Sequence, residues 1–138
     1  MPTWVARIDT PRRTLQTIAL SAVSGPAVVP VLFTGLGRDG LLREVSVNAA
    51  CWLTLYNSQA AYDADASRPL DADPAASSGV VADLRLPLLG GGVLQMPPGV
   101  SYGSADAPAQ AGLWARLRIE QGGVVTPELT LRTTVWVD

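Results

Sequence analysis

Apolar and polar residues alternate along three stretches of the chain, residues 45–56, 113–121 and 129–137. In residues 45–56 every odd position is apolar, and the even positions are mostly polar or aromatic. Successive side chains of a β-strand point to opposite faces, so a period of two predicts strands that bury one face. We therefore expect a strand in each stretch.

The second and third stretches are joined by a short connection that contains glycine and proline. Such a connection predicts an antiparallel hairpin. A register that pairs Glu120 with Arg132 would also set Arg116 opposite Trp136, which gives a salt bridge and a cation–π contact on one exposed face. We expect these pairs across the hairpin.

Weaker apolar runs, bounded by glycine or proline, predict five further strands at residues 4–8, 15–23, 28–33, 80–86 and 93–96. The alanine-rich residues 58–66 predict one or two helical turns over the end of a sheet. Many short strands with such turns are typical of sandwiches and barrels. We expect one all-β domain over residues 1–138, an antiparallel β-sandwich of jelly-roll or immunoglobulin-like type with about eight strands and one short helix.

The length and composition fit a single compact core. Of the 138 residues, 48% are hydrophobic and only 16% are charged. A chain of this size removes about two-thirds of its unfolded surface from water, so it needs neither disulfides nor a structural metal. The lone cysteine, Cys51, cannot form an internal disulfide and is expected to be a small buried hydrophobe within its alternating stretch.

The charged residues exclude several classes of function. Ten basic and twelve acidic residues leave a net charge of −2, too little positive field to hold a nucleic-acid backbone. All the basic residues are arginine, so the chain has no Schiff-base lysine, no imidazole base and no histidine metal ligand. Glu44, Glu120 and Glu128 fall at strand edges and turns, where solvated charges are usual. We expect no enzymatic activity, no cofactor and no nucleic-acid partner.

The N-terminal part superficially resembles a secretion signal, because Arg12 and Arg13 precede a mildly apolar run. Polar residues interrupt that run, and no signal is assigned. The longest apolar reach, residues 18–33, is shorter than the roughly 20 residues that cross a bilayer. No membrane association is expected.

Residues 35–40 match the pattern G-x-G-x-x-G that binds dinucleotides. A phosphate site of that kind needs a helix directly after the glycines, whereas residues 41–44 lead into an alternating strand. We interpret Arg38, Asp39 and Gly40 as a hairpin turn in which glycine takes a positive φ.

Four aspartates gather within residues 63–74, and spaced carboxylates can bind calcium. A calcium loop that starts at Asp63 needs glycine at its sixth position and glutamate at its twelfth, but the chain has Arg68 and Pro74 there. We expect these aspartates, including Asp71 and Asp73, to cap turns and to neutralise Arg68. Calcium binding is the alternative.

Aromatic and basic side chains lie opposite the aliphatic faces of the three main strands. They are Trp52, Trp114, Arg116, Arg132 and Trp136. Protein interfaces favour tryptophan, tyrosine and arginine and are poor in lysine, so this set is a candidate interface. The alternative is that the protein's own loops cover the rings.

One segment carries a family resemblance. Residues 52–69 have the sequence WLTLYNSQAAYDADASRP, and Asp73-Pro74 and the sequence GVVAD at residues 79–83 follow. This order of a strand ending in Leu-Tyr, an alanine-rich turn, an Arg-Pro pair, Asp-Pro and a glycine-led strand resembles small structural proteins of tailed bacteriophages. The resemblance covers about residues 45–137 and not residues 1–44.

The resemblance implies a non-enzymatic virion component and brings no catalytic residue with it. Within the motif, Asp63, Asp65, Arg68 and Pro69 are expected to form a structural loop. Arg68 would reach back to Asp63 or Asp65, and Pro69 would redirect the chain.

The resemblance therefore implies a structural protein of the phage particle, assembled in the bacterial host cytoplasm. It would act as a head decoration or cement protein, or as a tail, baseplate or fibre accessory. Expected partners are major capsid or baseplate and tail proteins, and further copies of the chain, as a homo-oligomer such as a trimer. A carbohydrate-binding module that attaches the particle to the host surface is the alternative.

Overall fold

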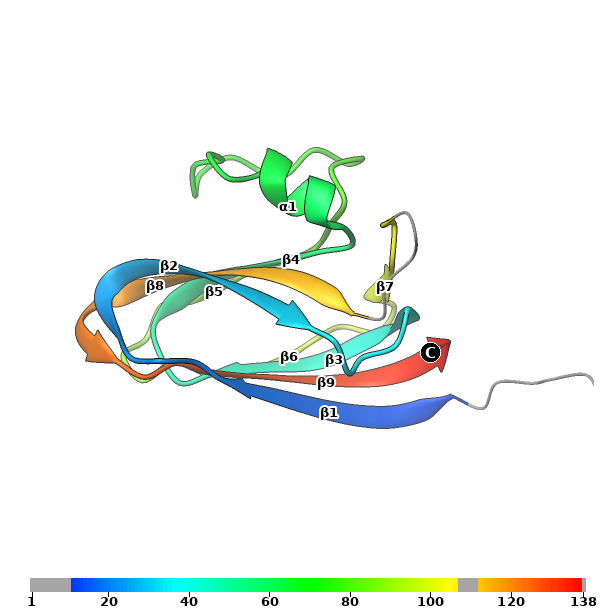
Figure 1. The fold of residues 1–138 in the computed structure, drawn as a ribbon, viewed down its shortest axis with the longest axis horizontal. Helices are drawn as coiled ribbons and strands as arrows, with labels where there is room; N and C mark the ends of the chain where they lie inside the picture. The colour runs from blue at the N-terminus through cyan, green and yellow to red at the C-terminus, as the bar shows by residue number, and fades with distance from the viewer. Residues whose placement is uncertain (1–10, 107–111, 138) are drawn as a thin grey trace, which may run out of the picture.

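The computed structural model describes residues 11–106 and 112–137 of the chain. Two antiparallel sheets pack face to face, and one short helix lies outside them, so the predicted all-β sandwich is confirmed (Figure 1). Sheet A contains β1 (Arg12–Ala19), β9 (Glu128–Val137), β3 (Asp39–Val47) and β6 (Gly92–Gln95), with β7 (Ser101–Gly103) also paired to β3. Sheet B contains β2 (Val23–Phe33), β8 (Leu113–Val125), β4 (Cys51–Tyr56) and β5 (Val80–Leu86).

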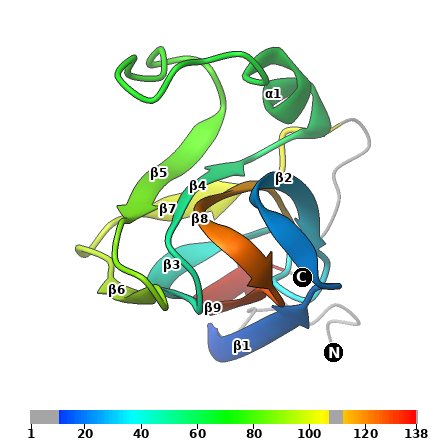
Figure 2. The ribbon, with the colours of Figure 1, turned by 90° about the vertical axis from the view of Figure 1, so that its left-hand side faces the viewer.

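The strand pairs are nested along the chain. β1 pairs with β9, β2 with β8, β3 with β6 and β4 with β5, so the first strand meets the last and the middle strands meet each other. The chain is in effect one long two-stranded ribbon, folded back between β4 and β5 and then rolled so that successive pairs fall in alternate sheets (Figure 2). This arrangement is a jelly roll, one of the two sandwich types that the sequence predicted.

The apolar core lies between the two sheets. Both sheets contribute fully buried side chains, for example Val45 and Leu131 from sheet A and Leu53 and Leu117 from sheet B. Cys51 is also completely buried in this core, as expected for a small hydrophobe.

Residues 45–56 form two strands, and the prediction of a single strand is wrong. β3 ends at Val47 and β4 begins at Cys51 in the other sheet. The corner is held by Asn48, whose side-chain amide donates to the carbonyl of Thr126 at 3.1 Å and whose oxygen accepts from the amide of Glu128 at 2.7 Å. The alternation continues through the corner because both sheets face the same core.

The predicted hairpin between residues 113–121 and 129–137 is also wrong. β8 belongs to sheet B and β9 to sheet A, so their short connection crosses from one layer to the other. Glu120 pairs with Arg85 instead, and Arg132 pairs with Glu44. Arg116 and Trp136 lie in different sheets and do not face each other.

Several weaker predictions are adjusted in the same way. The predicted strand at residues 15–23 spans most of β1 and the start of β2, and the one at 28–33 is the second half of β2. The strands at 80–86 and 93–96 correspond to β5 and β6, whereas β7 was not predicted. The predicted strand at residues 4–8 lies outside the described residues.

The glycine-rich residues 35–40 do not form a hairpin turn. They connect β2 in sheet B to β3 in sheet A, and Asp39 and Gly40 are already part of β3. The positive φ, 67°, belongs to Gly37.

One edge of sheet A is β1, and the other is formed by β6 and β7, which both pair with β3. The edge strands of sheet B are β2 and β5. β2 contains Pro26 and Pro30, which an edge strand tolerates because a proline in a central strand would remove a ladder hydrogen bond.

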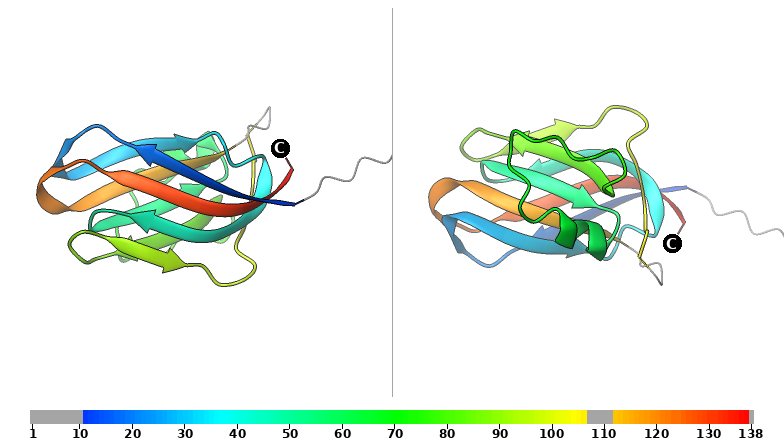
Figure 3. Two further views of the ribbon diagram at one scale, coloured as in Figure 1. Left: turned by 90° about the horizontal axis from the view of Figure 1, so that it is seen from below. Right: turned by 90° about the horizontal axis from the view of Figure 1, so that it is seen from above.

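Helix α1 (Gln59–Ala64) falls within the predicted helical residues 58–66. Ser58 caps it, since its hydroxyl accepts a hydrogen bond from the amide of Ala61 at 3.0 Å. The helix and the loop after it lie over the outer face of sheet B (Figure 3, right). Within residues 11–106 and 112–137, no helix is long and apolar enough to cross a membrane.

Candidate functional site

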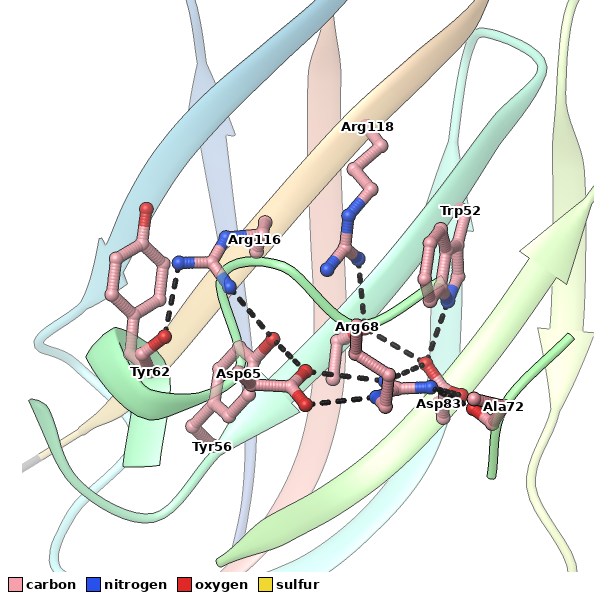
Figure 4. Close-up of polar contacts among 10 residues, drawn as sticks. Trp52, Tyr56, Tyr62, Asp65, Arg68, Ala72, Asp83, Arg116 and Arg118 are labelled. Atoms are coloured by element: carbon pink, nitrogen blue, oxygen red, sulfur yellow. Dashed lines mark hydrogen bonds and ion pairs between the residues drawn. The ribbon is translucent and has the colours of Figure 1, made fainter. Parts of the chain in front are cut away.

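The outer face of sheet B carries a layer of charged and aromatic side chains beneath α1 and its loop (Figure 4). Neighbouring strands bring them together, since Trp52 pairs with Arg118 and Thr54 pairs with both Arg116 and Asp83. Directly paired residues of antiparallel strands point to the same face, so these side chains form one contiguous patch. The loop adds Asp65 and Arg68, and α1 adds Tyr62. The complete layer consists of Trp52, Thr54, Tyr56, Tyr62, Asp65, Arg68, Asp83, Arg116 and Arg118.

Arg68 is the centre of this layer, and all of its guanidinium nitrogens are engaged. Nε and Nη2 donate to the two carboxylate oxygens of Asp65 at 2.8 and 3.2 Å. Nη1 and Nη2 donate to the two oxygens of Asp83 at 3.0 and 3.1 Å, and Nη1 also donates to the carbonyl of Ala72 at 2.8 Å. We call the three side chains of Asp65, Arg68 and Asp83 the Arg68 clasp.

The two carboxylates of the Arg68 clasp accept further hydrogen bonds. Asp83 accepts from the indole nitrogen of Trp52 at 2.6 Å and from the hydroxyl of Thr54 at 2.8 Å. Asp65 accepts from the hydroxyl of Tyr56 at 2.6 Å. The side chains of Arg68 and Asp65 are each only 9% exposed, so these bonds form largely out of water. Each charge is paired where it is buried, which is the condition for such a group to stabilise a fold.

Arg116 is a second buried arginine, only 5% exposed, and it is held by tyrosines. Its guanidinium carbon lies 4.0 Å from the ring centroid of Tyr62 and 5.7 Å from that of Tyr56. Nη2 donates to the carbonyl of Tyr62 at 2.9 Å, and Nη1 donates to the hydroxyl of Tyr56 at 3.4 Å. Because the Tyr56 hydroxyl in turn donates to Asp65, Arg116 is joined to the Arg68 clasp through that tyrosine.

Arg118 and Arg68 both stack on the indole of Trp52. The guanidinium carbons lie 3.6 Å and 5.1 Å from the ring centroid, respectively. Nη1 of Arg118 donates to the hydroxyl of Thr54 at 3.1 Å, whereas its Nη2 is buried with no hydrogen-bond partner among the described residues. The ring face of Trp52 therefore supplies much of the stabilisation of the Arg118 guanidinium.

The pKa values of the acidic groups follow from these contacts. Burial alone would raise the pKa of Asp83, but hydrogen bonds from Arg68, Trp52 and Thr54 outweigh it and hold the pKa below its ordinary value of 3.8. Burial alone would also raise the pKa of Asp65, but the hydrogen bonds from Arg68 and Tyr56 outweigh burial, so the pKa is lowered. Burial and the bond to Asp65 raise the pKa of Tyr56. Both carboxylates therefore become protonated at a lower pH than an ordinary aspartate does.

Most donors and acceptors of the layer are engaged with one another, Nη2 of Arg118 being an exception. A general acid or base needs a group that can exchange a proton with a bound substrate. Here the two carboxylates are already saturated by arginine, tryptophan, threonine and tyrosine donors. The thiol of Cys51 lies in the core, and burial raises its pKa to about 11, so it is a poor nucleophile.

The predicted structural loop is partly confirmed. Arg68 was predicted to contact Asp63 or Asp65, and it contacts Asp65. Asp63 is exposed and forms no hydrogen bond or ion pair with Arg68. Pro69 follows the Arg68 clasp at the surface, and its carbonyl accepts from the amide of Ala72 at 3.1 Å, which closes a turn.

The candidate interface residues are divided between the two faces of the molecule. Trp52 and Arg116 are buried beneath α1 and its loop, which corresponds to the alternative that the protein's own loops cover this face. Trp114 is half-buried, with its indole nitrogen donating to Asp106 at 3.2 Å. Arg132 and Trp136 are exposed on sheet A.

Sequence reasoning missed Asp83, Tyr56 and Arg118 as members of the layer. Asp83 had a usable signal, because the alternation within β5 places it on the outer face. Its partner Arg68 is 15 residues away, however, and no local spacing connects them.

The described residues contain no group of three or more histidine, cysteine, aspartate or glutamate side chains placed to hold a metal ion. Comparisons of the chain with protein-family models, with curated proteins and with solved structures found no match.

We predict that Arg68→Ala lowers the free energy of unfolding by about 1–3 kcal/mol, because it leaves two partly buried carboxylates without their main partner. Arg68→Lys should recover only part of this loss, since an ammonium cannot reproduce the two bidentate contacts. Urea unfolding followed by tryptophan fluorescence measures both variants.

Arg85→Ala is the matched control for that prediction. Arg85 also makes two hydrogen bonds to one carboxylate, that of Glu120, but its side chain is 52% exposed. An exposed pair of this kind contributes little to stability, so Arg85→Ala should lower the free energy of unfolding much less than Arg68→Ala does. Equal losses for Arg68→Ala and Arg85→Ala would show that the Arg68 clasp has no special structural role.

The lowered pKa values of Asp65 and Asp83 predict an acid-dependent loss of stability. A carboxylate whose pKa is lowered by folding contributes stability above its unfolded pKa and loses it as the pH falls through the folded pKa. The difference in unfolding free energy between the wild type and Asp83→Asn should therefore be constant near pH 7 and shrink below about pH 4. A difference that does not change with pH would contradict this assignment.

Proposed function

We propose that this protein is a non-enzymatic structural component of a tailed bacteriophage particle. It would serve as a head decoration or cement protein, or as a tail, baseplate or fibre accessory, and would dock onto other virion proteins. The observation that carries the proposal is that the segment resembling phage structural proteins, residues 52–83, spends its polar side chains on contacts within the protein. Its polar side chains, those of Arg68 and Asp83 among them, form the Arg68 clasp and its hydrogen bonds instead of lining an open site.

The jelly-roll fold is compatible with this role. Jelly rolls occur in viral capsid proteins and also in lectin domains. A fold alone does not determine a function, so this likeness supports the proposal only as an analogy.

The exposed apolar residues supply surfaces for docking. Leu88, Leu89 and Val124 are 72–84% exposed. The first two lie in the β5–β6 connection and Val124 lies near the end of β8, and both of these segments are at the left end of the molecule in Figure 1. Exposed apolar side chains that gather at one end are typical of contact sites with other proteins. On a particle, many identical weak contacts of this kind would add up to stable attachment.

A carbohydrate-binding module is the second candidate, and a groove near Trp136 favours it. This tryptophan is 49% exposed and lines a shallow groove of about 860 Å³ together with Asp39, Asn57, Ser101 and Tyr102. An exposed aromatic ring beside carboxylate, amide and hydroxyl groups is a combination that can stack on a sugar and hydrogen-bond its hydroxyls.

Immunogold electron microscopy tests the virion proposal. An antibody against this chain should label phage particles purified from the bacterium whose DNA encodes the chain. The position of the gold particles shows whether the chain lies on the head or on the tail. Absence of the chain from purified particles, both by labelling and by mass spectrometry, would refute the proposal.

A glycan array tests the second candidate. If the groove binds sugar, the wild type should bind specific glycans, and Trp136→Ala should lose that binding because it removes the stacking ring. Leu88→Ala, at an exposed apolar site away from the groove, is the control and should bind as the wild type does. A wild type that binds no glycan would leave the groove without this function.

A further inference from the structure

The outer face of sheet A contains a hollow that is rich in arginine. It has a volume of about 230 Å³, and its lining includes Arg13, Leu15, Arg43, Glu44, Gln95 and Arg132. These residues come from β1, β3, β6 and β9, so all four main strands of the sheet contribute. We call this feature the sheet A hollow.

A β-bulge creates the high local charge of the sheet A hollow. Leu42 pairs with Thr133 and Glu44 pairs with Arg132, which leaves Arg43 as an extra residue in β3. A bulge of this kind redirects a side chain that would otherwise point to the other face. Leu42 is buried, while Arg43 and Glu44 both line the sheet A hollow beside Arg132.

The sheet A hollow has an excess of positive charge. Its single carboxylate, Glu44, accepts hydrogen bonds from Arg132 at 3.3 Å and from Gln95 at 2.5 Å. Arg43 reaches only the hydroxyl of Thr134, at 3.4 Å, and Arg13 makes no hydrogen bond or ion pair with any described residue. Three guanidinium groups and one carboxylate give the sheet A hollow a formal charge of +2, and guanidinium groups match carboxylates as ligands.

The opposite side of the molecule carries the complementary charge. In the loop over sheet B, Asp71 and Asp73 are exposed and make no hydrogen bond or ion pair within the described part of the chain. Arg68, the nearest cation in sequence, is turned inward to the Arg68 clasp. Leu70, beside these aspartates, is 44% exposed. We call residues 69–73 the acidic loop.

We propose that the sheet A hollow binds the acidic loop of a second copy of this chain. The carboxylates of Asp71 and Asp73 would pair with Arg13 and Arg43, and Leu70 would cover the exposed Leu15 at the rim of the sheet A hollow. The inference rests on the proposed structural role and deepens it by naming the surfaces through which copies of the chain would meet.

This contact is head-to-tail, because its two halves lie on opposite faces of the sandwich. Figure 3 shows the two faces, with sheet A seen from below and the loop over sheet B seen from above. Each copy would offer the sheet A hollow to one neighbour and its acidic loop to another. Such contacts close into a ring when the rotations between copies add up to a full turn, and otherwise extend into a filament.

The test uses the full-length chain and two variants that each remove one half of the contact. Asp71→Arg/Asp73→Arg keeps the sheet A hollow, and Arg13→Glu/Arg43→Glu keeps the acidic loop. All four positions are exposed, so both variants should fold, which circular dichroism checks. Analytical ultracentrifugation gives the mass of each protein alone and of a 1:1 mixture.

We expect the wild type to associate in about 20 mM salt and to dissociate in about 500 mM salt, because exposed ion pairs are screened. Each variant alone should associate about a hundredfold more weakly or worse, since like charges then face each other. The mixture should associate again, because the intact acidic loop of one variant meets the intact sheet A hollow of the other, and the two reversed halves also carry opposite charges.

Glu128→Arg is the control for charge alone. Glu128 lies at the start of β9, away from the sheet A hollow and the acidic loop, so this variant should associate like the wild type or more strongly. A wild type that is monomeric at both salt concentrations would overturn the proposal, as would a mixture that forms no complex. These outcomes concern the contact alone, while labelling of phage particles tests the virion role separately.

Discussion

The structure depends on one constraint, which is that both sheets must bury their inner faces against the same apolar layer. Every strand therefore alternates between a core position and an outer position. The corner between β3 and β4 shows how strict this is, because Val47, Ala49 and Cys51 stay buried while the chain passes from one sheet to the other. With the inner faces committed to the core, the outer faces are left to carry the polar groups.

The segment between β4 and β5 has too few apolar residues for a core of its own, and charge holds it in place. Removing a guanidinium from water is costly, and the cost is offset only when its donors find acceptors. Arg68 meets this condition with Asp65, Asp83 and the carbonyl of Ala72. The planar fork of arginine can serve two carboxylates at once, which a lysine could not do.

The sequence allowed the fold class and the inward residues to be predicted, but not the strand pairing. The alternation of apolar and polar residues indicates which side chains of a strand face the core. This alternation is the same whether the next strand lies in the same sheet or in the other one. For this reason the assignments of Leu53, Leu117 and Leu131 to the core are correct, whereas the hairpin between residues 113–121 and 129–137 is wrong. A nested ribbon can be recognised only from its pairs, and in the pair of β1 with β9 the partners Arg12 and Val135 are 123 positions apart.

The candidate site was predictable only where its contacts are local. Arg68 and Asp65 are three residues apart, so the sequence suggested their pairing, and the structure contains it. The bond from Arg68 to Asp83 depends on how the loop folds back over β5. The bulge at Arg43 was likewise invisible, since no glycine or proline marks it.

The two prolines of β2 affect how copies of this protein can meet. An uncovered outer strand is a ready template for a strand from another molecule, and this is a common route to uncontrolled aggregation. Pro26 and Pro30 remove two backbone donors from β2, so a continuous ladder cannot extend from that side of sheet B. The β2 edge of sheet B is therefore a poor template for strand addition by another molecule.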